Sequence, residues 1–93
     1  MLRNNRLPSG STEILRALLR EPHREFKGLE ICDAASIPTG THHPALARLS
    51  ALGWISNRWD QPASGLPRQR RYRLNPDAID AINTAIQRKG SLR

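Results

Sequence analysis

The sequence predicts a mainly α-helical domain that carries one small β-hairpin, an α+β class. Three observations predict it. Apolar residues recur with a helical period in three segments before Gly53. The period then changes to two over residues 54–74, where aromatic and β-branched residues alternate with polar ones. A last helical pattern follows Asn75. The expected order is therefore helix, strand, helix, helix, strand, strand, helix.

The first helix is expected over residues 11–21. Ser11 or Thr12 offers an N-cap, and Glu13 suits the positive end of the helix dipole. Pro22 stops the helix, because proline lacks the N–H that continues the ladder. One face is apolar and is formed by Ile14, Leu15, Leu18 and Leu19. This stripe predicts a helix packed on a core.

A short strand over residues 24–27, anchored by Phe26, and a helix over residues 28–35 come next. Gly28 opens this second helix. Its buried side is expected to hold Leu29, Ile31, Cys32, Ala34 and Ala35. The sequence therefore places its one cysteine in the core.

The third helix is expected to run over residues 39–52, after a compact turn over residues 36–40. Pro44 falls near its first turn, where a missing N–H costs little. Gly53 ends the helix as a C′ glycine. The apolar stripe is Ala45, Leu46, Leu49 and Leu52.

Two strands over residues 54–59 and 69–74 form the hairpin, since two prolines and a glycine mark residues 60–67 as a loop. Asn75-Pro76-Asp77 then begins a last helix over about residues 75–89, with an N-cap and proline at N1. A helix-turn-helix followed by a hairpin wing is a known plan for docking on DNA. The third helix enters the major groove, and the wing over residues 60–70 lies on the backbone or the minor groove.

Charge and composition narrow the class of partner. Fifteen Lys and Arg face eight Asp and Glu, and the isoelectric point is about 11.3. This balance is typical of nucleic-acid binders, and it also fits membrane surfaces or acidic proteins. No apolar run approaches the roughly 20 residues of a membrane helix. Residues 1–10 lack the apolar stretch of a signal peptide and are expected to form a flexible arm before a single domain over residues 11–90. We expect a cytoplasmic, nucleoid-associated protein.

Five motifs spread over roughly residues 12–85 are specific when taken together. They are Ile14-Leu15-Arg16-Ala17-Leu18-Leu19, Gly28-Leu29-Glu30-Ile31, Pro38-Thr39-Gly40-Thr41 leading to Pro44-Ala45-Leu46-Ala47-Arg48-Leu49, Leu52-Gly53-Trp54-Ile55, and Gly65-Leu66-Pro67-Arg68 with Arg71-Tyr72-Arg73-Leu74. This combination resembles the DNA-binding domain of PadR-like winged-helix transcriptional regulators. The resemblance implies a dimeric repressor or activator whose third helix and wing hold operator DNA.

The candidate DNA-contacting residues come from the start of the second helix, the third helix and the wing. They are Lys27, Thr39, Gly40, Thr41, His42, His43, Arg48, Arg68 and Arg70. Backbone N–H groups over residues 39–41 are expected to hold a phosphate, and residues 41–43 to project from the first helical turn. Arg48 suits guanine, and the wing arginines suit phosphates or the minor groove.

Each candidate has a structural alternative. Thr39 can simply cap the helix, one histidine can pack on the core, and a run of arginines can be a solvated surface. Trp54 is expected in the core. For Trp59 two interpretations stay open: packing of the hairpin on the last helix, or half exposure at a dimer contact or small-molecule site. On the last helix, Ile79, Ile82 and Ile86 either pack on their own domain or form the seam of a homodimer, which a small core favours.

Metal binding and catalysis are not expected. Cys32, His23, His42 and His43 match no zinc spacing, and the acidic residues show no paired-carboxylate or Ser-His-Asp arrangement. The sequence implies no cofactor and no enzyme. Two other functions stay open beside DNA regulation: a winged-helix module that binds an acidic partner protein, and non-specific nucleic-acid binding that includes RNA. The operator and any small-molecule effector are not predicted.

Overall fold

The computed structural model describes residues 7–91, except for the side chains of residues 88–91. The predicted arm falls largely outside these described residues, in residues 1–6, and Leu7 packs partly buried against the core. The elements are α1 (Ser11–Arg20), β1 (Phe26–Lys27), α2 (Gly28–Ala35), α3 (His42–Ala51), β2 (Ile55–Trp59), β3 (Arg70–Leu74), the 3₁₀ turn η1 (Pro76–Ala78) and α4 (Ile79–Ser91). The predicted order and the α+β class are confirmed.

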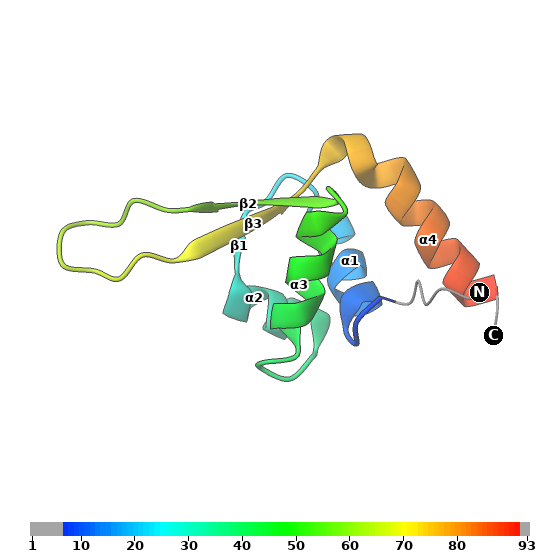
Figure 1. Cartoon of the computed structure of the whole chain (residues 1–93), viewed down its shortest axis with the longest axis horizontal. Helices are drawn as coiled ribbons and strands as arrows, with labels where there is room; N and C mark the ends of the chain where they lie inside the picture. The colour runs from blue at the N-terminus through cyan, green and yellow to red at the C-terminus, as the bar shows by residue number, and fades with distance from the viewer. Residues whose placement is uncertain (1–6, 92–93) are drawn as a thin grey trace.

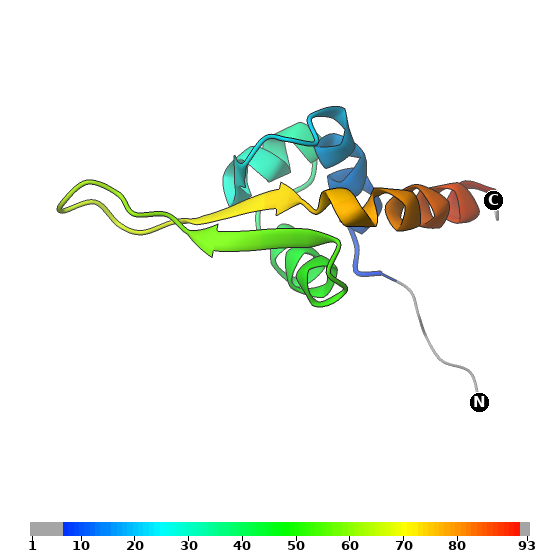
Figure 2. The same ribbon diagram turned by 90° about the horizontal axis from the view of Figure 1, so that it is seen from above.

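Three helices and a small sheet form the body of the molecule (Figure 1). The sheet is antiparallel in the order β1-β3-β2, with Phe26 opposite Tyr72 and Ile55 opposite Leu74. The hairpin of β2 and β3 projects from one end of the body and α4 from the other, so the molecule measures 50 × 26 × 25 Å (Figure 2). We call the hairpin over residues 55–74 the wing.

One continuous core lies between the three helices and the sheet. Its largest fully buried side chains are Phe26, Ile14, Leu15, Leu18, Ile31, Leu46, Leu49, Leu74 and Ile82. Every helix and both long strands contribute to it, which fixes the stem of the wing against α3. Cys32 is buried and Trp54 is partly buried against this core, as predicted.

The start of α1 differs from the prediction. The N-cap is Gly10, with φ +87°, and neither Ser11 nor Thr12 caps the helix. The Gly10 carbonyl accepts the first helical hydrogen bond from the Ile14 N–H at 2.9 Å. Glycine adopts this left-handed conformation without the strain that a Cβ brings. Ser11 is buried instead, and its Oγ has no hydrogen-bond partner among the described residues.

The third helix is shorter than predicted and begins at His42 rather than near Thr39. The preceding residues form a tight turn, in which the Thr41 N–H donates to the Pro38 carbonyl at 3.1 Å. Gly40 makes this turn possible with φ +100°. The predicted C-terminus is confirmed: Gly53 has φ +79°, and the N–H groups of Gly53 and Trp54 close a Schellman motif on the last turn of α3.

The last helix begins as predicted, because the Asn75 side chain accepts a hydrogen bond from the Asp77 N–H at 3.0 Å beside Pro76. Its first turn is 3₁₀. Ile82 is fully buried in the protein's own core, so the prediction of a dimer seam is wrong for this residue, while Ile79 and Ile86 are partly buried. No helix within residues 7–91 is long and apolar enough to cross a membrane.

Candidate nucleic-acid interface

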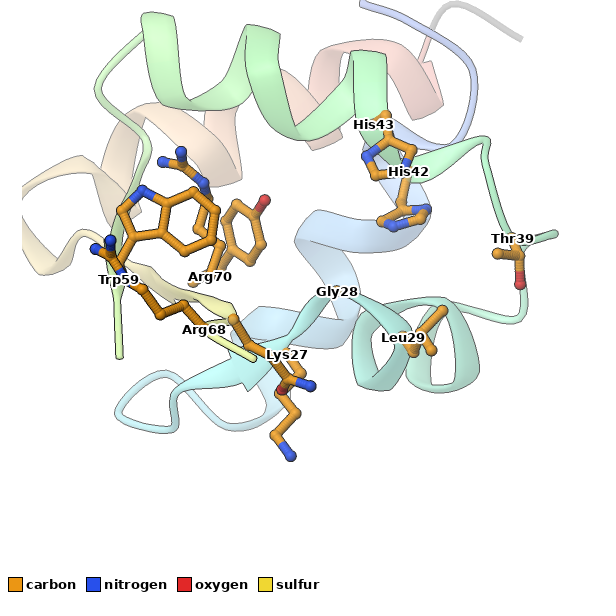
Figure 3. A pocket seen from close by; sticks show the side chains of 11 residues that line it. Lys27, Gly28, Leu29, Thr39, His42, His43, Trp59, Arg68 and Arg70 are labelled. Atoms are coloured by element: carbon orange, nitrogen blue, oxygen red, sulfur yellow. The ribbon is translucent and has the colours of Figure 1, made fainter. Parts of the chain in front are cut away.

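A groove of about 520 Å³ separates the wing from the N-terminal ends of α2 and α3. Its lining is Lys27, Gly28, Leu29, Thr39, His42, His43, Trp59, Arg68, Gln69, Arg70 and Tyr72. Figure 3 shows the tryptophan and the two arginines on one side, facing Thr39, His42 and His43 across the groove. Lys27, Arg68 and Arg70 supply three positive charges, and no Asp or Glu within the described part of the chain lines the groove. We call this surface the basic groove.

Strand alternation determines which wing residues face the basic groove. Ile55 pairs with Leu74, and both are buried in the core. Side chains two residues apart share a face of a strand, so Trp59 and its partner Arg70 lie on this same face, farther along the wing. Arg73, which is paired with Ser56, lies on the opposite face.

Two wing arginines are neutralised by carboxylates. The Arg58 guanidinium binds the Glu25 carboxylate through two hydrogen bonds of 2.7 and 2.8 Å, which lowers the pKa of Glu25. Arg71 Nε lies 3.2 Å from Asp60 Oδ2. The pKa of Asp60 is lowered first by the backbone N–H of Gln69 and then by Arg71. These two ion pairs compensate the charges of Arg58 and Arg71.

Arg68 and Arg70 have no carboxylate partner among the described residues. Their guanidinium carbons lie 5.1 and 4.4 Å from the centroid of the Trp59 ring. Arg70 also donates a hydrogen bond to the Asn57 side chain. A guanidinium has five N–H donors, so most of those on these two arginines stay available to an anion. Arg68 and Arg70 therefore bring uncompensated positive charge to the basic groove. Arg73 also has no carboxylate partner among the described residues, but it does not line the groove.

The two histidines at the start of α3 have opposite environments. His42 is only 4% exposed, so the prediction that its side chain projects to solvent is wrong. Its position precedes Ala45, Leu46 and Leu49 by three, four and seven residues, which places it on the buried face of α3. His43 is exposed and lines the groove, with its ring 4.1 Å from that of His42.

His42 is held as a neutral side chain. Its Nδ1 accepts a hydrogen bond from the Gly40 N–H at 3.2 Å, and burial followed by the neighbouring His43 lowers its pKa. The ring lies against Gly28, where an added Cβ would meet Nε2 at 3.2 Å. His42 thereby joins the start of α2, the turn and α3 at the wall of the groove.

The predicted phosphate site on backbone N–H groups of residues 39–41 is not formed as expected. The Gly40 N–H donates to His42, and the Thr41 N–H donates to Pro38. Thr41 turns its methyl group toward Gly10, where a Cβ would lie 3.1 Å away, and it does not line the groove. Two of the three expected donors, those of Gly40 and Thr41, are therefore already used within the turn.

Among the other predicted residues, Lys27, Thr39, Arg68 and Arg70 line the groove. Arg48 does not, and it lies exposed farther along α3.

Five lining residues are not predicted from the sequence. They are Gly28, Leu29, Trp59, Gln69 and Tyr72. Leu29 was expected to be buried and is 62% exposed, because it lies off the face that carries Ile31 and Cys32. Trp59 lines the groove rather than packing on the last helix. Strand alternation predicts that Trp59 lies on the same face of the hairpin as Ile55. The β3 residue that lies opposite Trp59 depends on the register of the two strands across a long loop, which the sequence pattern does not give.

Comparison with solved structures identifies the fold. A PadR family transcription regulator from Clostridium difficile superposes with a TM-score of 0.68 at 19% identity, covering 89% of this chain and 88% of that one. A transcriptional regulator from Clostridium thermocellum gives 0.69 at 22% identity, covering 89% and 82%. A Bordetella bronchiseptica protein, whose DNA binding is regulated by 6-hydroxynicotinic acid, gives 0.63 at 17% identity, covering 95% and 67%. No protein-family model and no curated protein sequence matches the chain.

These similarities establish that the chain has the winged-helix fold of PadR family regulators. They confirm the fold that the sequence motifs implied. In this fold α2 and α3 form the helix-turn-helix, and β2 and β3 form the wing.

Proposed function

We propose that this protein is a DNA-binding transcriptional regulator that represses by occupying promoter DNA. The basic groove is the observation that carries the proposal. When the recognition helix of a winged helix lies in the major groove and the wing reaches the neighbouring minor groove, one sugar–phosphate strand runs between them. The basic groove lies between the wing and the start of α3 and is suited to hold that strand, because three cations and no carboxylate of the described residues line it.

The proposed DNA contacts are of two kinds, contacts to phosphates and contacts to base edges. Lys27, Arg68 and Arg70 bind phosphates of the strand in the groove, and Thr39 and His43 add hydrogen bonds from its other side. Arg48, on the exposed surface of α3, contacts base edges, for which guanine is the best acceptor of a bidentate arginine. His42 acts indirectly by fixing the turn before α3.

We further propose that the protein is a cytoplasmic homodimer without catalytic activity. A two-fold dimer sets two recognition helices about 34 Å apart, one turn of DNA. The projection of α4 away from the wing (Figure 2) supports this arrangement, because residues 83–87 of α4 are exposed or only partly buried. Ile79 and Ile86, which are only partly buried, are the residues of α4 suited to the seam.

Selection from a random pool of short DNA duplexes tests the proposal. A sequence-specific regulator enriches a palindrome with half-sites about 10 bp apart. Retention without enrichment indicates non-specific nucleic-acid binding, and no retention favours a module that binds an acidic protein. The Arg68→Ala/Arg70→Ala variant is the control, since it removes only surface cations and is expected to fold while retaining little DNA.

A further inference from the structure

Trp59 is a large aromatic residue that folding does not account for. Its side chain is 46% exposed at the end of β2, where it lines the basic groove beyond the body of the domain. A half-exposed tryptophan forgoes much of the stabilisation that its burial brings. Two guanidinium carbons, those of Arg68 and Arg70, lie within 5.1 Å of the centroid of its ring.

We propose that Trp59 is a positioning residue that holds Arg68 and Arg70 toward the basic groove for binding to DNA phosphates. This inference rests on the proposed function and adds a residue and a mechanism to it. An arginine side chain has many rotamers, and the conformational entropy that it loses when binding immobilises it weakens the complex. An indole face attracts guanidinium groups through its quadrupole, and tryptophan does so best among aromatic residues. The ring thus restricts both side chains before DNA arrives.

The distribution of carboxylates supports this role. Arg58 and Arg71 are oriented by Glu25 and Asp60, which also cancel their charge. An aromatic ring orients an arginine without cancelling its charge. Trp59 therefore does for two arginines what an acidic residue cannot do at a phosphate site: it fixes their geometry and leaves the positive charge available.

The test measures binding to a fluorescein-labelled random-sequence duplex by anisotropy at low salt. Trp59→Leu, which keeps an apolar side chain without a π face, is expected to weaken binding about 5- to 10-fold. Trp59→Phe retains an aromatic face and is expected to stay within about 2-fold of the parent protein. Both variants should keep the parental thermal midpoint, since the ring is half exposed.

A double-mutant cycle separates positioning from direct contact. In the Arg68→Ala/Arg70→Ala background, Trp59→Leu should change binding by less than about 1.5-fold, because the groups it positions are gone. An equal loss in both backgrounds, or no loss from Trp59→Leu in the parent protein, overturns the inference. Failure of the proposed function looks different: the parent protein does not bind the duplex, or the double arginine variant binds as tightly as the parent.

Discussion

Substituting Gly28 by alanine tests the packing that fixes the start of α3. An alanine Cβ would lie 3.2 Å from His42 Nε2 and 3.3 Å from Cδ2, closer than ordinary van der Waals contact. The ring has little room to retreat, because it contacts His43 and its Nδ1 is hydrogen-bonded to the Gly40 N–H. Overpacking of this kind costs about 1–3 kcal/mol. Alanine at an ordinary helix position recovers roughly 0.5–1 kcal/mol.

The net expectation for Gly28→Ala is a loss of about 1 kcal/mol in the free energy of unfolding, or a thermal midpoint about 4–8 °C lower for a domain of this size. Thermal and urea unfolding followed by circular dichroism measure it. In a His42→Ala background the clash is absent, and the same Gly28→Ala change should stabilise by about 0.5 kcal/mol. The same sign in both backgrounds would refute the account of His42 as the residue that meets Gly28.

Two other perturbations address the histidine and the last helix. Folding lowers the pKa of His42 below its ordinary 6.5, so the unfolded chain takes up the proton more readily. The contribution of neutral His42 to the free energy of unfolding is complete above about pH 6.5 and declines as the pH falls toward the lowered pKa. Thermal midpoints measured over a series of pH values should therefore fall less toward acid pH in His42→Ala than in the parent protein. Ile82→Ala should cost about 2–5 kcal/mol because Ile82 is fully buried, and Ile86→Ala clearly less. Equal effects of the two isoleucine substitutions would contradict the packing described for α4.

The sequence predicts elements well where local signals agree. Gly53 ends α3 as its position indicates, and Asn75 with Pro76 begins the last helical segment. It fails where the docking plan of the helix-turn-helix is weighed above periodicity. That plan predicts that His42 projects toward DNA from the first turn of the helix, yet its spacing to Leu46 and Leu49 puts it on the buried face of α3.

Other features depend on contacts that no local pattern contains. The start of α3 shifts by three residues because the Gly40 N–H is taken by His42 and the Thr41 N–H by Pro38. The pairing of Trp59 with Arg70 requires the register of a hairpin whose loop spans ten residues, 60–69. The difference between the paired Arg58 and the unpaired Arg68 likewise follows from tertiary contacts, since Glu25 is far from the wing in sequence.

The salt dependence of DNA binding tests the central claim most directly, because each phosphate contact releases a counterion. For the parent protein, log Kd should rise steeply with log salt concentration, and Arg68→Ala or Arg70→Ala should each reduce that slope by about 0.9. Arg73→Ala, which removes an exposed arginine from the opposite face of the wing, should leave it unchanged. A flat response in the parent protein, or an equal reduction by Arg73→Ala, would contradict a phosphate-binding groove at this position.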